Sequence, residues 1–160
     1  MINSIYVIHR SGSMLFNESW GDENVAITDR AHLISGLLTA FTGLTEEALK
    51  DQLKEIILQN QRILFKFFPS HYIVIVAKKN VESVFLQKIL DKISDEFNIR
   101  FDIREFSGKI DEFRTFTSFV NKIINENKIK RVNIKENLKT LLRDEMLKLS
   151  LKKYGGEILD

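Results

Sequence analysis

The sequence predicts an α+β protein with a five-stranded antiparallel sheet, built as a hairpin, a helix and a three-strand meander, and flanked by helices on both faces. Two observations carry this prediction. Strand-like runs occur at the start of the chain and again between residues 53 and 79, where the connections are too short for parallel crossovers. Helical periodicity of apolar residues fills most of the remaining chain. Helices packed on an antiparallel sheet are the expected architecture.

The first two strands form a hairpin around the turn "SGS" at residues 11–13. Residues 5–8 are all apolar, so both faces of the first strand are apolar, which is typical of a strand at the centre of a sheet. Gly12 can adopt the positive φ that a short connection between antiparallel strands usually needs.

A first helix follows a polar loop, and Thr28 or Asp29 can serve as its N-cap. Its apolar residues recur at helical spacing, at Leu33, Ile34, Leu37, Leu38, Phe41 and Leu44. Small residues lie between them, including Gly36 and Gly43, although each glycine weakens a helix by about 1 kcal/mol relative to alanine. We therefore expect this helix to pack closely on the sheet.

The meander consists of strand-like runs at residues 53–58, 62–68 and 71–79. The last run is unbroken apolar sequence rich in β-branched residues, which predicts a strand buried on both faces. We expect this strand to pair with the first strand of the chain.

Helices dominate the rest of the sequence. Asn80 can cap a second helix, and residues 99–106 fit either a strand or an extended link. A third helix is predicted over residues 110–125, with an aromatic stripe of Phe113, Phe116 and Phe119 that we interpret as packing. A fourth helix begins at a capping box of Asn133 and Glu136 and stops at two glycines, residues 155 and 156.

Composition limits the class of protein. The chain has 160 residues, 44% of them hydrophobic, and a single proline, so we expect one folded domain. Within it, residues 1–106 form the α/β core and residues 107–160 a helical extension packed on the same domain. The chain has no cysteine, which excludes disulfides and thiolate zinc sites and favours a reducing compartment. No apolar run is long enough to span a bilayer, so we expect a cytoplasmic protein with at most peripheral membrane contact.

Catalytic and metal-binding patterns are weak. His9 could act as a base for Ser11 or Ser13, but residues two and four apart across a tight hairpin are not generally placed for hydrogen bonding, so we interpret them as turn residues. His9, His32 and His71 lack metal-ligand spacing, although His9 and His71 would meet if their strands pair. No phosphate-binding glycine pattern occurs. We expect no catalytic residue, no cofactor, no metal and no small-molecule substrate.

The C-terminal part of the chain is basic. Residues 121–153 contain ten Lys or Arg and four Asp or Glu, a balance of +6. Such a bias is typical of a solvated helix face or of a surface that meets an anionic partner. The residues that would form the basic patch are Lys128, Lys130, Arg131, Lys135, Lys139 and Arg143.

The order of these elements resembles the longin domain family, the SNARE-like fold that trafficking adaptors also use and that is related to roadblock domains. The resemblance covers residues 3–100 and lies in "IYVIHRSGSMLFN", "DRAHLISGLLTAFTGLTEEAL", "LKEIILQNQRILFKFFPSHYIVIVAKKN" and "VESVFLQKILDKISDEFNIRF". It implies a five-stranded sheet with the first helix on one face and the later helices on the other. It also implies a non-enzymatic scaffold that dimerises, binds small Ras-like GTPases or helps to place a partner at a membrane. No SNARE heptad motif and no transmembrane tail follow.

The predicted function is therefore a non-enzymatic interaction scaffold, a homo- or heterodimer that binds a small Ras-like GTPase or a trafficking partner. Candidate contacts are Trp20, Arg30 and His32, together with an exposed edge strand from Arg62 to Phe67, because an open sheet edge can pair with a partner. The alternative is a nucleic-acid or anionic-membrane binding protein that uses the basic C-terminal helices. Steep weakening of binding by salt would favour the alternative.

Overall fold

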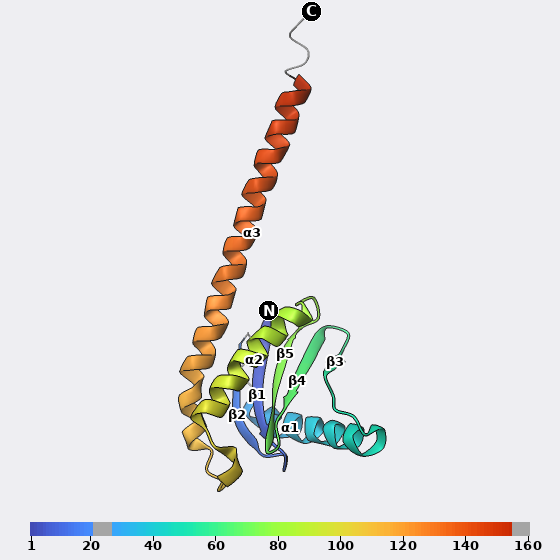
Figure 1. Ribbon diagram of the computed structural model, residues 1–160, viewed down its shortest axis with the longest axis vertical. Helices are drawn as coiled ribbons and strands as arrows, with labels where there is room; N and C mark the ends of the chain where they lie inside the picture. Colours follow the sequence, from blue (N-terminus) through green and yellow to red (C-terminus); the bar gives the residue numbers. More distant parts are fainter. Residues whose placement is uncertain (21–26, 155–160) are drawn as a thin grey trace, which may run out of the picture. The chain divides into compact units, whose positions relative to one another are not determined.

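The computed structural model describes residues 1–20 and 27–154, without the side chains of residues 27–29, 105, 129, 131, 132 and 154 (Figure 1). The elements in chain order are β1 (Ile2–His9), β2 (Met14–Ser19), α1 (Ile27–Leu44), the π-helical turn η2 (Thr45–Leu49), β3 (Glu55–Ile57), β4 (Gln61–Phe67), β5 (His71–Lys78), α2 (Ser83–Arg100), the 3-10 turns η3 (Ile103–Glu105) and η4 (Asp111–Phe116), and α3 (Thr117–Tyr154).

The five strands form one antiparallel sheet in the order β2-β1-β5-β4-β3, as the sequence predicts. The expected pairing of the first strand with the central strand is confirmed, with Val7 opposite Ile73. Residues 71–77 of β5 are all buried, which fits its position in the middle of the sheet. β2 and β3 form the two edges.

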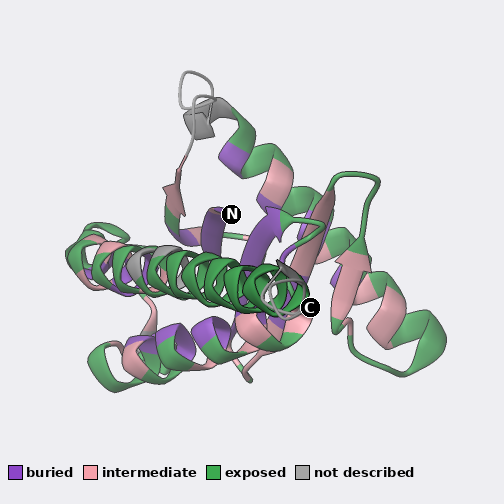
Figure 2. Ribbon diagram, turned by 90° about the horizontal axis from the view of Figure 1, so that it is seen from above, coloured by how far each residue is buried: buried purple, intermediate pink, exposed green. Residues whose placement is uncertain are grey.

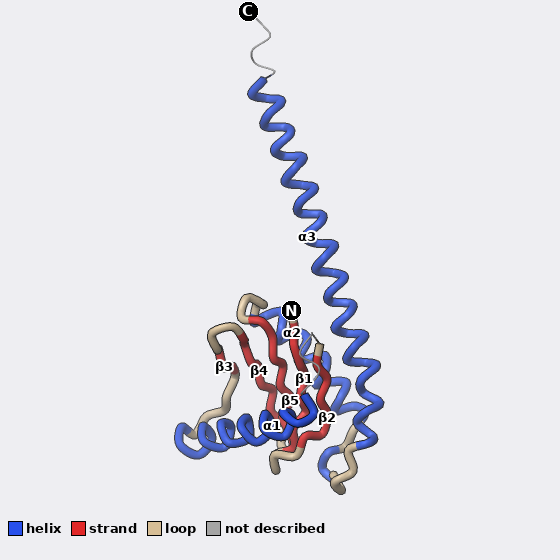
Figure 3. The backbone as a smooth tube through the Cα atoms, turned by 180° about the vertical axis from the view of Figure 1, so that it is seen from behind, coloured by secondary structure: helices blue, strands red, loops and turns tan. Residues whose placement is uncertain are grey.

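Helices cover both faces of the sheet. Figure 3 shows α1 in front of the strands and α2 behind them, and Figure 1 shows the same arrangement from the other side. Side chains of α1 and the sheet form one buried cluster, made of Tyr6, Ile8, Leu38, Phe65, Tyr72, Val74 and Val76. The buried residues of α2 are Leu86, Ile89, Leu90, Ile93, Ser94 and Phe97.

An aromatic cluster lies at the C-terminal end of α2, around Phe97. The ring of Phe97 lies 4.9 Å from that of Phe101, 5.7 Å from Phe113 and 5.3 Å from Phe116, measured between ring centroids. Phe113 and Phe116 are fully buried and Phe119 is half-buried. The predicted aromatic stripe is therefore a packing stripe.

The hairpin turn has the conformation that its glycine predicts. Gly12 has a φ of +91°, and its backbone N–H donates to the carbonyl oxygen of His9 over 2.8 Å. L-residues with a side chain rarely adopt this φ. In contrast, a Cβ at Gly36 or Gly43 would meet no atom within 4 Å, so the expectation that these glycines serve close packing is wrong.

Helix boundaries differ from the predicted ones in two places. α1 is already helical at Ile27, so the predicted caps Thr28 and Asp29 lie within its first turn, and their side chains are outside the described ones. The N-cap of α2 is Glu82 rather than Asn80, and its side chain makes no capping hydrogen bond.

The C-terminal helix is continuous. α3 runs without interruption over 38 residues, where the sequence predicts two helices separated before the capping box of Asn133 and Glu136. No glycine or proline occurs between residues 117 and 154, so nothing in the backbone breaks the helix. The ambiguous residues 99–106 contain the end of α2 and the short turn η3, so they do not form a strand.

The chain divides into two compact units, Met1–Val120 and Asn121–Asp160. The first unit contains the sheet, α1, α2 and the start of α3, and it includes residues 107–120. The packing of the remaining C-terminal helix on the same domain stays a prediction. Among the described residues, no helix is both long and apolar enough to cross a membrane.

Candidate protein-docking surface

Helix α1 contacts the sheet through a buried face that contains both polar and apolar residues. Ala31, Ser35, Leu38 and Thr42 are buried and recur every three or four residues, as one face of a helix does. The hydroxyl of Thr39 forms a 2.7 Å hydrogen bond with that of Tyr72 on β5, which ties the helix to the sheet.

A row of large apolar side chains lies on the solvent side of the same helix. Leu33 is 73% exposed, Leu37 58%, Phe41 44% and Leu44 62%. We call these four residues the α1 stripe. Single exposed leucines are normal, whereas contiguous exposed apolar side chains mark a surface that meets a partner.

Helix α1 packs on the sheet as the sequence predicts, but only some of its apolar residues take part in that contact. Leu38 is buried and Ile34 half-buried, but the α1 stripe faces solvent. The apolar arc of this helix is wider than the face that the sheet covers. A helix with a second apolar face is expected where a partner covers that face.

The edge strand β3 lies in the same unit. β3 is a three-residue strand, and within the part of the chain that the structure describes it pairs only with β4. Ile56 packs against the core on the α1 side, whereas Ile57 is 56% exposed and Leu58 just beyond it 46% exposed. An unpaired strand edge with apolar side chains is a template for a further strand.

Ion pairing holds this edge strand in place. The Nε of Arg62 lies 2.7 Å from Oε1 of Glu55 on β3, and Nη1 of Arg62 donates to the carbonyl oxygen of Val81 over 3.0 Å. Arg62 therefore links β3 and β4 to the segment before α2. Phe67 stacks on Phe65 with 6.0 Å between ring centroids, and the Arg10 guanidinium carbon lies 5.2 Å from its ring centroid.

These contacts correct the predicted edge. Arg62 and Phe67 lie on β4, which is the second strand from this edge, so the prediction that β4 is the edge strand is wrong, although β3 pairs with β4 only from Arg62 to Leu64. The exposed edge on this side is β3. Residues 58–60 join β3 and β4 as a short hairpin, and a hairpin alone does not show which of its two strands is outermost in the sheet.

The other predicted contacts lie at three separate places in the first unit. Trp20 is half-buried after β2, and its backbone N–H donates to the carbonyl oxygen of Asn3 over 2.8 Å. Arg30 and His32 are both exposed on α1. Arg30 precedes Leu33 by about one turn and shares its side of the helix, whereas His32 faces a pocket at the hairpin.

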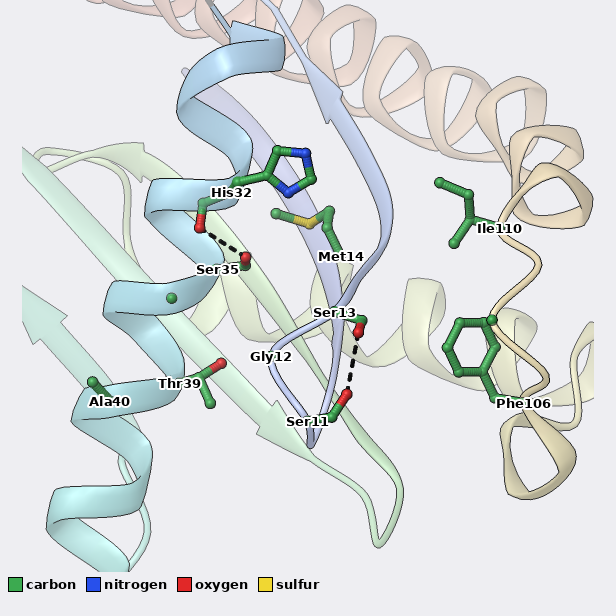
Figure 4. A pocket seen from close by; sticks show the side chains of 12 residues that line it. Ser11, Gly12, Ser13, Met14, His32, Ser35, Thr39, Ala40, Phe106 and Ile110 are labelled. Atoms are coloured by element: carbon green, nitrogen blue, oxygen red, sulfur yellow. Dashed lines mark hydrogen bonds between the residues drawn. The ribbon is translucent and has the colours of Figure 1, made fainter.

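That pocket has a volume of about 780 Å³ and is seen in Figure 4. Its lining comes from the hairpin turn, from α1 and from the segment after η3: Ser11, Gly12, Ser13, Met14, His32, Ser35, Gly36, Thr39, Ala40, Phe106, Gly108 and Ile110. The hydroxyl of Ser35 donates to the carbonyl oxygen of His32 over 3.1 Å, and that of Thr39 is bonded to Tyr72. These two hydroxyls of the pocket therefore form hydrogen bonds within the protein itself.

The hairpin turn carries a chain of hydrogen bonds that the sequence analysis did not expect. The Nδ1 of His9 lies 2.8 Å from the hydroxyl oxygen of Ser11, which lies 3.2 Å from that of Ser13. Side chains two residues apart in this hairpin therefore do form hydrogen bonds, contrary to the prediction. The backbone N–H of Ser11 also donates to Nδ1 of His9 over 3.2 Å, so the imidazole stabilises the turn itself.

His71 is the most perturbed group in the sheet. It lies opposite His9, as expected if the two strands pair, and its ring is 4.9 Å from that of Phe68. Burial, together with the nearby charges of His9 and Arg10, lowers the pKa of His71 from 6.5 to about 4. His71 is therefore neutral at pH 7. Among the described residues, no group of three or more His, Asp or Glu side chains could hold a metal ion.

The predicted basic patch lies on α3, largely in the second unit. The exposed side chains are Lys128, Lys130, Lys135, Lys139 and Arg143. The side chain of Arg131 lies outside the described ones. Lys128, Lys135, Lys139 and Arg143 are spaced seven, four and four residues apart, so helical geometry places them along one side of α3, whereas Lys130 is turned away from them.

Comparisons with known proteins identify the fold. No protein-family model matches the sequence, and no curated protein matches it. Among solved structures, a roadblock/LC7 domain from Streptomyces avermitilis is similar over 61% of this chain and 82% of its own length, with a TM-score of 0.50 and 10% identity.

Two further structures resemble the chain more weakly. MglB of Myxococcus xanthus has a TM-score of 0.45 and 12% identity over 61% of this chain and 84% of its own. A chain in a homology model of the full-length AP-3 complex has a TM-score of 0.48 and 8% identity over 85% and 99%. The assignment of the fold depends on the Streptomyces domain. The chain has a roadblock-like and longin-like fold, as the resemblance in its sequence predicts.

Proposed function

We propose that this chain is a docking module that pairs with a second copy through the α1 stripe and the edge of β3, and that the pair binds a small Ras-like GTPase or a trafficking partner. The role proposed is binding rather than catalysis. The observation that carries the proposal is the α1 stripe, a row of four large apolar side chains on the solvent side of a helix.

The exposed apolar area supports pairing on energetic grounds. Full burial of one leucine or phenylalanine side chain stabilises by about 2 kcal/mol, so covering this partly exposed stripe contributes on the order of 5 kcal/mol per copy. Association costs roughly 4 to 15 kcal/mol in lost freedom of motion. Two stripes that cover each other therefore contribute enough to offset much of this cost, whereas one stripe against a polar surface does not.

The strand edge supplies direction and register. An unpaired edge offers backbone N–H and C=O groups to an incoming strand, and two β3 strands related by a two-fold axis would pair antiparallel. Ile56 and Ile57 point to opposite sides of the sheet, so a paired strand would cover apolar side chains on both. Backbone hydrogen bonds would then add to the apolar contact of α1.

Binding of a GTPase is supported by the resemblance to longin and roadblock domains. The predicted contact Arg30 lies on the same side of α1 as Leu33 and remains a candidate. The predicted contacts Trp20 and His32 lie away from the α1 stripe. Arg62 already pairs with Glu55 on β3, and the ring of Phe67 contacts that of Tyr72 on β5.

Pairing is tested with the double substitution Leu37→Asp and Phe41→Asp, measured by sedimentation equilibrium of the full chain. Wild type is expected to sediment as a dimer and the variant as a monomer with an unchanged circular dichroism spectrum, because both positions face solvent. Val84→Asp is the matched control, since Val84 is 68% exposed in the first turn of α2, where an acidic residue is well tolerated. A monomeric wild type, or a control that dissociates equally, would contradict the pairing.

GTPase binding is tested separately. The immobilised chain is incubated with purified small Ras-like GTPases of the source organism, loaded with GDP or a GTP analogue. Retention of one GTPase in one nucleotide state supports the proposal. Retention of none by a dimeric chain would remove the GTPase from the proposal and leave the pairing intact.

A further inference from the structure

The distal half of α3, residues 133–154, carries an apolar face that nothing covers within the described chain. Ile134, Leu138, Leu142 and Met146 follow one another at four-residue spacing and are 52% to 71% exposed. Leu141 and Leu149 lie beside them and are also exposed. We call these six residues the distal apolar face; this half of the helix is coloured as exposed in Figure 2. A helix of 22 residues is about 33 Å long, so this face is extended.

Charged residues are arranged around this face in a definite order. Lys135, Lys139 and Arg143 form a row that directly follows Ile134, Leu138 and Leu142, so each cation flanks the apolar face. At about 100° per residue, Glu136 and Asp144 are turned well away from it. Glu145 lies within the face, and its Oε1 is 3.4 Å from the Nζ of Lys148, which offsets its charge.

A second copy of α3 is a poor partner for this face. A coiled coil needs apolar residues at both core positions of a heptad over several heptads. In residues 133–154, no heptad register has more than three successive apolar core positions before a charged or polar residue interrupts it. Two such helices would also bring their flanking lysines together, and like charges at those positions disfavour pairing.

A nucleic acid is also a poor partner. Binding to phosphates uses cations and leaves apolar side chains unused. Here Lys135, Lys139 and Arg143 border an exposed face of large apolar side chains, which a nucleic acid would leave in water.

An anionic lipid surface fits both features. A helix that lies in the plane of a membrane buries its apolar face at the boundary between headgroups and acyl chains. Lysine and arginine beside that face extend their charged ends to the lipid phosphates, and acidic residues on the opposite side stay in water.

We propose that residues 134–149 of α3 bind an anionic lipid surface, with the distal apolar face buried at the acyl boundary and Lys135, Lys139 and Arg143 contacting lipid phosphates. This inference does not depend on pairing or on GTPase binding by the first unit. It gives the chain a peripheral membrane site of its own.

The test is co-sedimentation of the full chain with vesicles of phosphatidylcholine alone or mixed with phosphatidylglycerol. Binding is expected only to the mixed vesicles, and it should weaken as salt is raised. Each lysine near an anionic surface is worth about 1 kcal/mol, or about fivefold in affinity, so Lys135→Gln with Lys139→Gln should lower the affinity by roughly 25-fold.

Two matched double substitutions test whether binding depends on the distal apolar face or on any exposed leucines of α3. Leu138→Gln with Leu142→Gln should abolish sedimentation with the mixed vesicles. Leu147→Gln with Leu151→Gln removes the same number of leucines, 60% and 70% exposed, from another side of the helix and should retain binding. Circular dichroism checks that both variants keep their helix.

Three outcomes would overturn the proposal. Equal sedimentation with neutral vesicles would contradict the role of the cations. Equal loss in both leucine variants would contradict the role of the distal apolar face. The third outcome is a chain that does not bind vesicles but binds duplex DNA, and still does so with Leu138→Gln and Leu142→Gln. That result would assign the basic residues to nucleic-acid binding.

Discussion

Acid should destabilise the sheet through one buried histidine. His71 is 2% exposed, and its environment lowers its pKa from 6.5 to about 4. Its ring is stacked on Phe68 and lies 5.5 Å from the ring of Phe97, and the charges that face it come from His9 and Arg10. Burial removes the water that would solvate an imidazolium ion here, and the charges of His9 and Arg10 oppose a further positive charge. Protonation of this histidine therefore favours the unfolded chain.

The sign and size follow from linkage. A folded pKa below the unfolded value means that the unfolded state binds more protons, so stability is full above pH 6.5 and is lost as the pH falls towards 4. A shift of 2.5 units corresponds to about 3 kcal/mol at 1.36 kcal/mol per unit. Most of this loss should occur between pH 6.5 and pH 4.

Urea unfolding of the full chain at a series of pH values measures this effect, with the free energy of unfolding plotted against pH. In His71→Gln the decrease between pH 6.5 and pH 4 should be smaller than in wild type by about 3 kcal/mol, because the group that takes up the proton is gone. His32→Gln, at an exposed position of α1, should keep the wild-type decrease, since His71 remains. A His71→Gln curve parallel to wild type across this window would refute the reasoning.

Two further pairs of substitutions test the backbone conformation and the packing. Gly12→Ala should lower the free energy of unfolding by about 1 kcal/mol or more, because φ is +91° at this position. Gly36→Ala should raise it by up to about 1 kcal/mol, because this position lies in open space on α1. Urea unfolding measures both changes, and the same sign for both would contradict the assigned conformations. Phe97→Ala, at the centre of the aromatic cluster, should cost about 3 to 5 kcal/mol, and half-buried Phe119→Ala clearly less; equal midpoints of thermal unfolding would contradict the proposed core.

Local chemistry was enough to predict the sheet. Connections of three residues cannot join parallel strands, so the sequence from residue 53 to residue 79 had to form an antiparallel meander. The unbroken apolar run in β5 indicated a central strand, because only a strand covered on both faces needs apolar residues at every position. Gly12 marked the turn for a similarly local reason, its access to positive φ.

The candidate site was less accessible to sequence reasoning. The hydrogen bond between His9 and Ser11 depends on the shape of one turn, which residue types do not specify. The runs that form β3 and β4 are both apolar, so the sequence does not show which one is the edge, and only the pairing of strands shows which one lacks a neighbour. The one signal available for β3 was its shortness, since edge strands are often short.

The sequence by itself determined which residues share a face, because helical and strand periodicity are properties of the local backbone. It determined that α1 has a wide apolar arc and that α3 has cations beside its apolar rows. Only the tertiary structure decided that Leu38 is buried while Leu37 and Phe41 face solvent. How much of a helix surface is covered by a sheet depends on how the helix and the sheet pack against each other. The periodicity of apolar residues carries no information about that packing.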